Sequence, residues 1–295
     1  MAAPNYTLCD TYESVVVAAS TLSRSSILIL DCEARDLARP TGVLSIVSIS
    51  DVDATTIFLI DALALRDSSN PALVPLFDLL SSGTVTKLMW DGRADALELR
   101  ETFGVELRGV LDLQLAEVVS RKSVRRETEE SRLRRLATGY FKQMRHDILR
   151  DPAAYEGIDQ VSGMKNSLKA CGIHDSKDAA VVALHEAKGS AMWLQRPLPK
   201  ALLQYAAHDL KLIAALYTSF VRAGWINGRD LPLLKEQSER YIRTLHTRAL
   251  KDLFDQRNLG MFVSLHVIDT PPPDAQLYEC ESCHQQNTKT IAGAC

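Results

Sequence analysis

Apolar and polar positions in the first part of the chain form short extended runs separated by turn residues. Three runs rich in aliphatic and β-branched residues occupy 27–33, 42–50 and 56–63. Such runs are typical of β-strands. Connections this short favour antiparallel neighbours, because a parallel pair needs a longer crossover. The pattern therefore predicts an antiparallel meander of three strands.

Helical spacing of apolar positions dominates the rest of the chain. The clearest helix has Pro199 near its start and Gly224 at its end, as expected from the conformational preferences of these two residues. A meander followed by alternating strand and helix predicts an α/β fold with a mixed sheet. We expect helices at 13–23, 72–81, 94–104 and 197–224, one or two further helices at 230–257, and one further strand at 85–90.

The composition is that of an ordinary soluble globular protein, with 46% hydrophobic and 24% charged residues among 295. No apolar run approaches the roughly 18 residues of a membrane-spanning helix, so no membrane partner is expected. The first residues lack a basic segment followed by an apolar core, so we expect no secretory signal. Six scattered cysteines form no disulfide framework and favour an intracellular location, either cytoplasmic or nuclear.

The charge is unevenly distributed along the chain. A net charge of −3 argues against a generally basic nucleic-acid binder, yet residues 121–150 carry ten Lys or Arg against four Asp or Glu. This stretch lies in a helical segment, 121–160, that we interpret as an insertion or mobile arm. Its charges are either a solvated helix face with i,i+4 ion pairs or a surface for a polyanion. The sequence leaves both alternatives open.

Acidic residues stand at four places where the pattern predicts regular structure. Asp31 and Glu33 end the first strand, and their i,i+2 spacing directs both to one face. Asp95 lies at the start of a helix just after the strand at 85–90. Its negative charge could simply stabilise that helix through an interaction with the helix dipole. Tyr205 and Asp209 are four residues apart and share one face of the strongest helix. Carboxylates at the end of a buried strand need compensation of their charge.

Convergence of these acids in one cleft would explain all four positions. Carboxylates that meet repel one another unless they are protonated or neutralised by a cation. Mg²⁺ and Mn²⁺ are bound by such oxygens and keep coordination positions for water and phosphate. A pair of these ions stabilises both the attacking and the leaving oxygen of a phosphodiester displacement. Tyr205 could then orient the attacking water through a hydrogen bond.

Three segments of the sequence resemble the exonuclease motifs of the DEDD superfamily. They are LDCEARDL, KLMWDGRADALELRETFG and WLQRPLPKALLQYAAHDLKLIAALY. The chain resembles most closely the ribonuclease D-like 3′–5′ exonucleases, which include the exonuclease 3′–5′ domain-containing proteins. The resemblance covers residues 10–222, and the Y-x-x-x-D spacing is typical of the tyrosine subclass (DEDDy). It implies a ribonuclease H-like mixed sheet flanked by helices.

The resemblance also implies a role for each motif residue. Asp31 would bridge two Mg²⁺ or Mn²⁺ ions, with Glu33 and Asp209 completing one site. Asp95 would bind the second ion through water, and Tyr205 would position the nucleophilic water. The implied reaction is hydrolysis at the 3′ end of RNA or single-stranded DNA, releasing nucleoside 5′-monophosphates. The sequence does not choose between RNA and DNA.

Several residues near the motifs leave alternatives open. Asp91 lies close to Asp95 and is a rival for its metal-binding role. Arg196 is either a structural arginine or a substrate contact on the phosphate side. In the basic segment, Arg125 and Arg126 are further candidates for substrate binding. An exonuclease-like domain could also be catalytically silent and bind only nucleic acid or protein.

The last part of the chain is expected to lie outside the exonuclease domain. We expect a helical extension at 223–268 and a Pro-rich linker with a polar tail at 269–295. Cys280 and Cys283 are spaced as half of a zinc site, with Cys295 at the end of the chain. The tail is therefore either without structure, a zinc knuckle, or half of a site shared by two chains. A protein partner could bind through 121–160 or through this tail.

Overall fold

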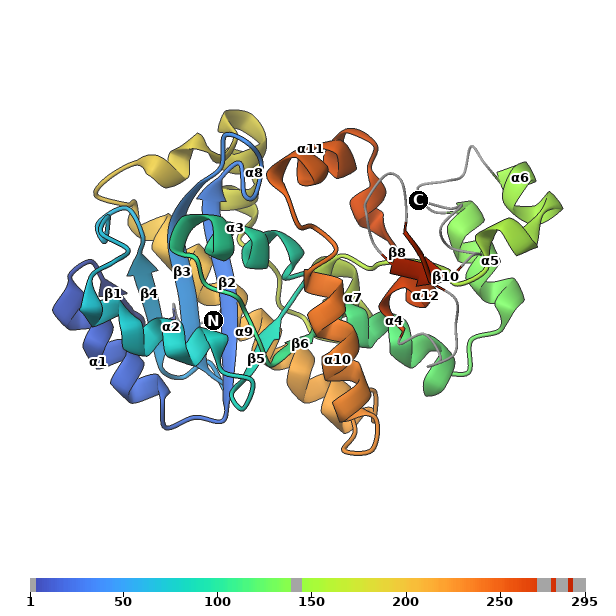
Figure 1. Cartoon of the computed structure of the whole chain (residues 1–295), viewed down its shortest axis with the longest axis horizontal. Coiled ribbons are helices and arrows are strands. Elements are labelled where there is room, and N and C mark those ends of the chain that lie inside the picture. The colour runs from blue at the N-terminus through green and yellow to red at the C-terminus, as the bar shows by residue number, and fades with distance from the viewer. Residues whose placement is uncertain (1–3, 139–144, 270–276, 280–285, 289–295) are drawn as a thin grey trace. The chain divides into compact units, whose positions relative to one another are not determined.

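The computed structural model describes residues 4–138, 145–269, 277–279 and 286–288 (Figure 1). The chain divides into two compact units. The first comprises Met1–Ser120 and Ser162–Asn258, and the second comprises Arg121–Val161 and Leu259–Cys295. Among the described residues, no helix has the length and apolar character needed to cross a membrane.

A six-stranded mixed sheet is the centre of the first unit, with the strand order β1-β4-β3-β2-β5-β6. β2, β3 and β4 form the predicted antiparallel meander, whereas β1–β4, β2–β5 and β5–β6 are parallel pairs. The predicted α/β fold with a mixed sheet is confirmed. The strands are β1 (Thr7–Cys9), β2 (Ile27–Arg35), β3 (Val43–Asp51), β4 (Ile57–Asp61), β5 (Thr86–Met89) and β6 (Val110–Asp112).

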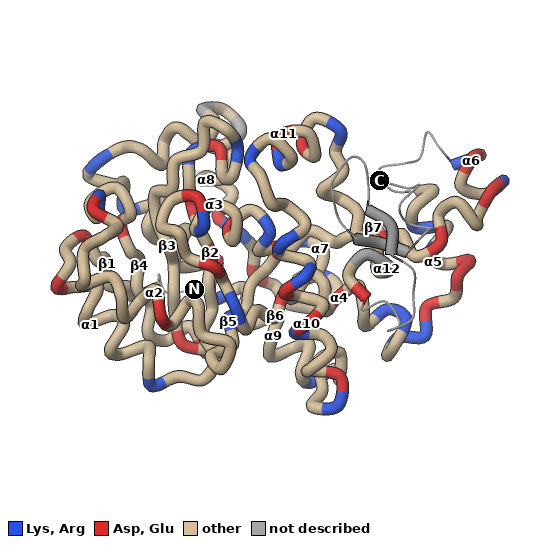
Figure 2. The backbone as a smooth tube through the Cα atoms, in the orientation of Figure 1, with Lys and Arg blue, Asp and Glu red and all other residues tan. Residues whose placement is uncertain are grey.

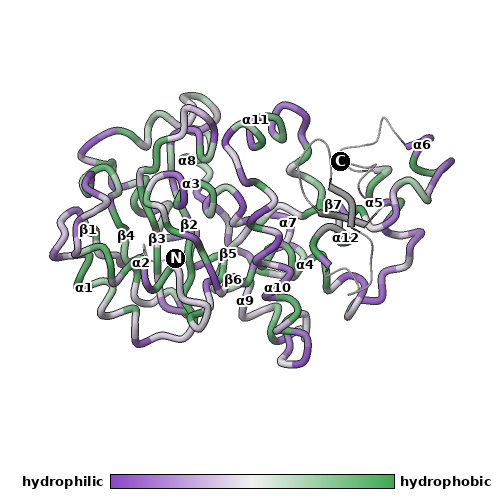
Figure 3. The backbone as a smooth tube through the Cα atoms, viewed as in Figure 1, coloured by the Kyte–Doolittle hydropathy of each residue, from purple (hydrophilic) through white to green (hydrophobic). Residues whose placement is uncertain are grey.

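Helices cover both faces of this sheet. α1, α2 and α3 lie over one face, and α9 crosses the other face behind β2, β3 and β4 (Figure 1). The strands of the sheet are predominantly hydrophobic, and the loops between elements are more hydrophilic (Figure 3). The helices are α1 (Tyr12–Leu22), α2 (Val74–Ser81), α3 (Arg93–Phe103), α4 (Leu113–Ser123), α7 (Met164–Ala170), α8 (Ala179–Lys188), α9 (Lys200–Arg222), α10 (Leu231–Ile242) and α11 (Arg248–Gln256).

The helix boundaries follow the sequence signals closely. α3 ends before Gly104, whose φ of 69° is the left-handed conformation that glycine adopts most easily. The long helix α9 begins at Lys200, after Pro199 at the N-cap, and Gly224 follows it with a φ of 71°. The sequence did not predict β1 and β6, because strands of three residues are too short to show a periodic pattern.

The second unit joins two segments that are far apart in the chain. It contains α5 (Glu129–Thr138), α6 (Arg145–Arg150), β7 (Ile158–Gln160), β8 (Phe262–Ser264), α12 (Leu265–Ile268), β9 (Leu277–Glu279) and β10 (Gln286–Thr288). β7 pairs antiparallel with β8, and a small core forms around Leu133, Leu136 and Ile148. The basic segment thus packs with residues from Leu259 onward, whereas α10 and α11 belong to the first unit. This division differs from the boundaries expected from the sequence.

Candidate active site

Strand β2 directs two of the predicted acids away from the core that lies under α1 and α2. Leu28, Leu30 and Cys32 are buried in that core, so the intervening Asp31 and Glu33 point to the opposite face. The pairing register with β3 shifts just after Glu33. Regular pairing of β2 with β3 is therefore interrupted immediately beyond the two acids. Cys32 is a packing residue, as the alternation predicts.

Helix α9 brings the third acid to the same place. α9 packs against β2, and Asp209 on its buried side is only 1% exposed. Carboxylate oxygens of Asp31, Glu33 and Asp209 all lie within 4.8 Å of one another. Oδ1 of Asp209 is buried and has no hydrogen-bond partner among the described residues. We call Asp31, Glu33 and Asp209 the acidic cluster. One of its buried carboxylate oxygens, Oδ1 of Asp209, thus accepts no hydrogen bond from the described residues.

The electrostatics of the acidic cluster show a shortage of positive charge. Burial, together with the charge of Asp209, raises the pKa of Asp31 to about 7. Burial and the charges of Asp31 and Asp209 also raise the pKa of Glu33 well above its ordinary value. For Asp209, burial raises the pKa although the neighbouring Lys177 opposes this shift. Like charges and desolvation thus both disfavour ionisation of these three carboxyl groups.

Lys177 is a site residue that the sequence analysis missed. Its ammonium group donates to Oδ2 of Asp209 and to the hydroxyl oxygen of Tyr205, the latter at 3.2 Å. It also lies 5.2 Å from the centre of the Tyr205 ring. Desolvation lowers the pKa of Lys177, but the charges of Asp209 and Asp31 outweigh it and raise that pKa. Because Lys177 lies in a loop outside all three motifs, only the need for a cation could have indicated it.

Asp95 occupies a distinct position beside the acidic cluster. It lies in the first turn of α3, is buried, and its Oδ1 accepts a hydrogen bond from the backbone N–H of Cys32 at 2.8 Å. Burial and the charge of Asp31 raise the pKa of Asp95 well above its ordinary value. Its rival, Asp91, instead forms an ion pair with Arg93. Asp91 thus has a charged partner within the chain, and the choice of Asp95 over Asp91 as a metal ligand stays a prediction.

Arg196 has structural partners within the chain. Its guanidinium group binds both carboxylate oxygens of Asp61, at 2.7 and 2.8 Å, and donates to the carbonyl oxygen of Trp193. A further N–H donates to the hydroxyl of Ser45 at 3.0 Å. These bonds support the structural alternative for Arg196, and its contact with substrate stays a prediction.

The basic segment contains internal ion pairs as well as candidate substrate contacts. Arg134 pairs with Glu130 and Arg135 with Glu127, and residues of both signs of charge occur along α5 and α6 (Figure 2). Arg125 and Arg126 lie in the loop between α4 and α5. Their role in substrate binding stays a prediction. The possible zinc ligands lie outside the described residues: Cys280, Cys283 and Cys295.

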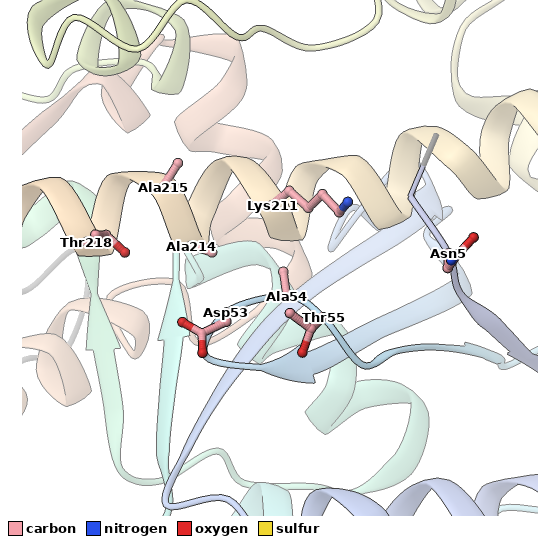
Figure 4. A pocket seen from close by; sticks show the side chains of 8 residues that line it. All are labelled: Asn5, Asp53, Ala54, Thr55, Lys211, Ala214, Ala215 and Thr218. Atoms are coloured by element: carbon pink, nitrogen blue, oxygen red, sulfur yellow. The ribbon is translucent and has the colours of Figure 1, made fainter. Parts of the chain in front are cut away.

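A pocket of about 600 Å³ lies elsewhere on α9, against the turn between β3 and β4. Lys211 and Ala214 of α9 line it together with Asp53 and Thr55 of that turn (Figure 4). None of the predicted catalytic residues lines this pocket. It is thus separate from the acidic cluster, although both use side chains of the same helix.

Comparisons with known proteins identify similar folds. A family model described as 3′–5′ exonuclease matches residues 6–149. Trypanosoma brucei RNase D is similar in structure, with 24% identity, coverage of 81% of this chain and 72% of that chain, and a TM-score of 0.59. Its complex with RNA U12 gives 25% identity, coverage of 81% and 70%, and a TM-score of 0.59. Escherichia coli RNase D is 18% identical, with coverage of 81% of this chain and 50% of that chain, and a TM-score of 0.50. A search of curated proteins gave no match.

These matches confirm the predicted resemblance to ribonuclease D-like exonucleases and the predicted ribonuclease H-like sheet with flanking helices. The residues that match the family model include Asp31, Glu33 and Asp95. Tyr205 and Asp209 lie beyond the matched residues. The roles of the individual site residues therefore stay predictions.

Proposed function

We propose, from the match of residues 6–149 to the 3′–5′ exonuclease family model, that the chain is a two-metal-dependent 3′–5′ exonuclease. It hydrolyses phosphodiester bonds of RNA or single-stranded DNA and releases nucleoside 5′-monophosphates. The observation that carries this proposal is the acidic cluster, in which three carboxylates lie within 4.8 Å of one another around a single lysine. A group so short of positive charge is suited to binding divalent cations.

The residues of the site fit Mg²⁺ or Mn²⁺. The donor set consists of carboxylate oxygens, which these hard cations prefer, and Oδ1 of Asp209 has no hydrogen bond within the described chain that an ion would have to displace. Asp31, Glu33 and Asp209 would hold one ion, and Asp31 and Asp95 the second. When bound, such a pair of ions supplies Lewis-acid stabilisation of the attacking and leaving oxygens.

We propose that Tyr205 acts as a hydrogen-bonding group and not as a base. Burial and the charge of Asp209 raise the pKa of Tyr205 above its ordinary value, so its hydroxyl stays protonated at neutral pH. The ring packs near Trp193, with 6.3 Å between the ring centres, and this contact limits how far the hydroxyl can move. Tyr205 can therefore orient a water molecule beside the acidic cluster.

The proposed substrate is a single nucleic-acid strand with a free 3′ end. The similarity to the RNase D that was solved in complex with RNA U12 supports nucleic acid as the ligand. Arg125 and Arg126 are proposed to contribute to binding through phosphate contacts. Reversing both to glutamate should reduce the slope of log affinity against log salt concentration by about 1.4 for a single strand. An unchanged slope would exclude them from the interface.

The direct test of this function uses oligonucleotides labelled at either end. The purified chain is incubated with RNA or DNA strands in Mn²⁺, Mg²⁺ or EDTA, beside Asp31→Asn. A ladder that shortens from the 3′ end, requires metal and is lost in Asp31→Asn is the expected result. Binding of the strand without any cleavage would instead identify a catalytically silent nucleic-acid-binding module.

Chain polarity and product identity complete the test. With a 5′ label, a 3′–5′ exonuclease gives a series of shortening strands, whereas a 3′ label is released as the mononucleotide. Chromatography of that product should show a nucleoside 5′-monophosphate. Release of a nucleoside 3′-monophosphate would show that the other P–O bond of the phosphodiester is cleaved, and it would contradict the proposed reaction.

A further inference from the structure

The loop that carries Lys177 is fixed on both sides of this residue. Oδ1 of Asp175 lies 3.2 Å from Nε2 of His208, within hydrogen-bond distance. His208 is the neighbour of Asp209 on α9. Asp178 is the N-cap of α8, and its carboxylate accepts the N–H of Ala180 at 2.8 Å. The position of Lys177 over the acidic cluster is therefore determined by the fold on either side of it.

The lysine side chain reaches the acidic cluster from its solvent side. The Lys177 side chain is 38% exposed, while that of Asp209 is 1% exposed. Its ammonium group binds one oxygen of Asp209, and it acts electrostatically on Asp31 and Glu33 as well. One lysine thus supplies positive charge to three carboxylates. Because its side chain is flexible and partly exposed, the ammonium group can move from Asp209 into solvent.

We propose that Lys177 is the counter-ion of the metal-free acidic cluster and must withdraw from Asp209 when a divalent ion binds. This inference rests on the proposed function, because it assigns the same carboxylates to the metal. A divalent ion bound at about 2.0–2.1 Å to the free Oδ1 of Asp209 lies close to the ammonium group on Oδ2 of the same carboxylate, and the two positive charges repel each other. Lys177 therefore weakens metal binding, and before the metal arrives it compensates part of the negative charge of the cluster.

Metal titration of charge-altered variants tests this role without measuring catalysis. Binding of Mn²⁺ to the full chain is measured by calorimetry for the wild type, Lys177→Met and Lys177→Arg. Lys177→Met keeps the apolar stem and removes the charge, so it should bind Mn²⁺ about tenfold more tightly, or by about 1.4 kcal/mol. Lys177→Arg keeps the charge and should stay within about threefold of the wild type.

A matched control removes a positive charge from the same region without touching the acidic cluster. Lys211 lies on α9 two residues after Asp209, but it lines the pocket that faces Asp53 and Thr55 (Figure 4). Lys211→Met should therefore bind Mn²⁺ like the wild type. An equal gain in Mn²⁺ affinity in Lys211→Met and Lys177→Met would show that the gain results from the change in net charge alone. That result would overturn the inference.

Thermal unfolding provides a second measurement that remains valid if Lys177→Met folds poorly without metal. In EDTA this variant should melt below the wild type, because its carboxylates lose their counter-ion. Saturating Mn²⁺ should raise its melting temperature by more than it raises that of the wild type. Unchanged Mn²⁺ affinity and an equal rise would overturn the inference while leaving the metal site in place. Failure of both the wild type and Lys177→Met to bind Mn²⁺ would overturn the proposed function itself.

Discussion

Two groups of acids in the first unit have opposite surroundings. Glu98 is completely buried, but Arg248 contacts both of its oxygens, and the N–H of Ala38 donates to one of them. Asp61 is held by two N–H groups of Arg196. Both acids therefore have the paired and hydrogen-bonded surroundings that make a buried charge tolerable.

The acidic cluster lacks such surroundings. Asp31, Glu33 and Asp209 share one ammonium group, and Oδ1 of Asp209 accepts no hydrogen bond within the described residues. The comparison teaches that burial of an acid does not by itself indicate function. An acid that is buried beside other acids, with too few donors, indicates a site for a cation that the chain does not supply.

Removal of one acid from the cluster should have the largest effect on activity and little effect on folding. Asp31→Asn keeps the size of the side chain but removes a bridging carboxylate, so the cleavage rate should fall by about 10³-fold or more. In EDTA the variant should be at least as stable as the wild type, because one like charge is gone. Cleavage rate and urea unfolding test the two halves of this prediction. Full activity in Asp31→Asn would contradict its assigned role.

Removal of a paired acid should give the reverse result. Glu98→Gln leaves Arg248 without its nearer charged partner, with only Glu101 left at 4.0 Å, so the free energy of unfolding should fall by about 3 kcal/mol. The cleavage rate per folded molecule should stay near that of the wild type, because Glu98 lies outside the acidic cluster. Urea unfolding measures the loss. A variant of unchanged stability would show that this ion pair contributes nothing net to folding.

Tyr205 should show an intermediate effect that separates orientation of water from metal binding. Tyr205→Phe removes the hydroxyl and keeps the ring that packs near Trp193. The cleavage rate should fall by about 10–100-fold, since a water-orienting hydrogen bond is lost. Affinity for Mn²⁺, measured by calorimetry, should change little, because Tyr205 is not assigned as a metal ligand. A large loss of Mn²⁺ affinity would contradict this division of roles.

The smallest effect concerns the pH dependence of stability in EDTA. The pKa of Asp31 in the folded chain is raised to about 7 from an ordinary value of 3.8. The folded state therefore binds more protons than the unfolded state between these values. The contribution of this group to stability is full below about pH 4 and is lost as the pH rises through 7. Relative to Asp31→Asn, the wild type should lose stability from pH 5 to pH 8. A constant difference between the two proteins would refute the raised pKa.

Much of the fold could be predicted because its signals are local. The β2–β4 meander is joined by short turns, and apolar spacing together with Pro199 and Gly224 marks α9. Side-chain periodicity also predicted that Asp31 and Glu33 share one face of their strand. Periods of 2 and 3.6 residues are properties of single elements, so they can be read without the tertiary structure.

The missing parts of the site depend on contacts between distant segments. Lys177 meets Asp209 from a loop that has no periodic pattern, and the N–H of Cys32 binds Asp95 across 63 residues. The pairing of β7 with β8 likewise joins strands of three residues from separate parts of the chain. No local preference encodes such contacts. The family resemblance supplied Asp95, whereas nothing in the motifs supplied Lys177.

Anomalous diffraction from crystals soaked with Mn²⁺ tests the central claim most directly. We expect a manganese peak within about 2.0–2.3 Å of oxygens from Asp31, Glu33 and Asp209, with the Lys177 ammonium group moved off Asp209. Crystals of Asp31→Asn should show that peak weakened or absent. An acidic cluster without manganese at millimolar concentration, with Lys177 still bound to Asp209, would contradict the claim that these acids form a metal site.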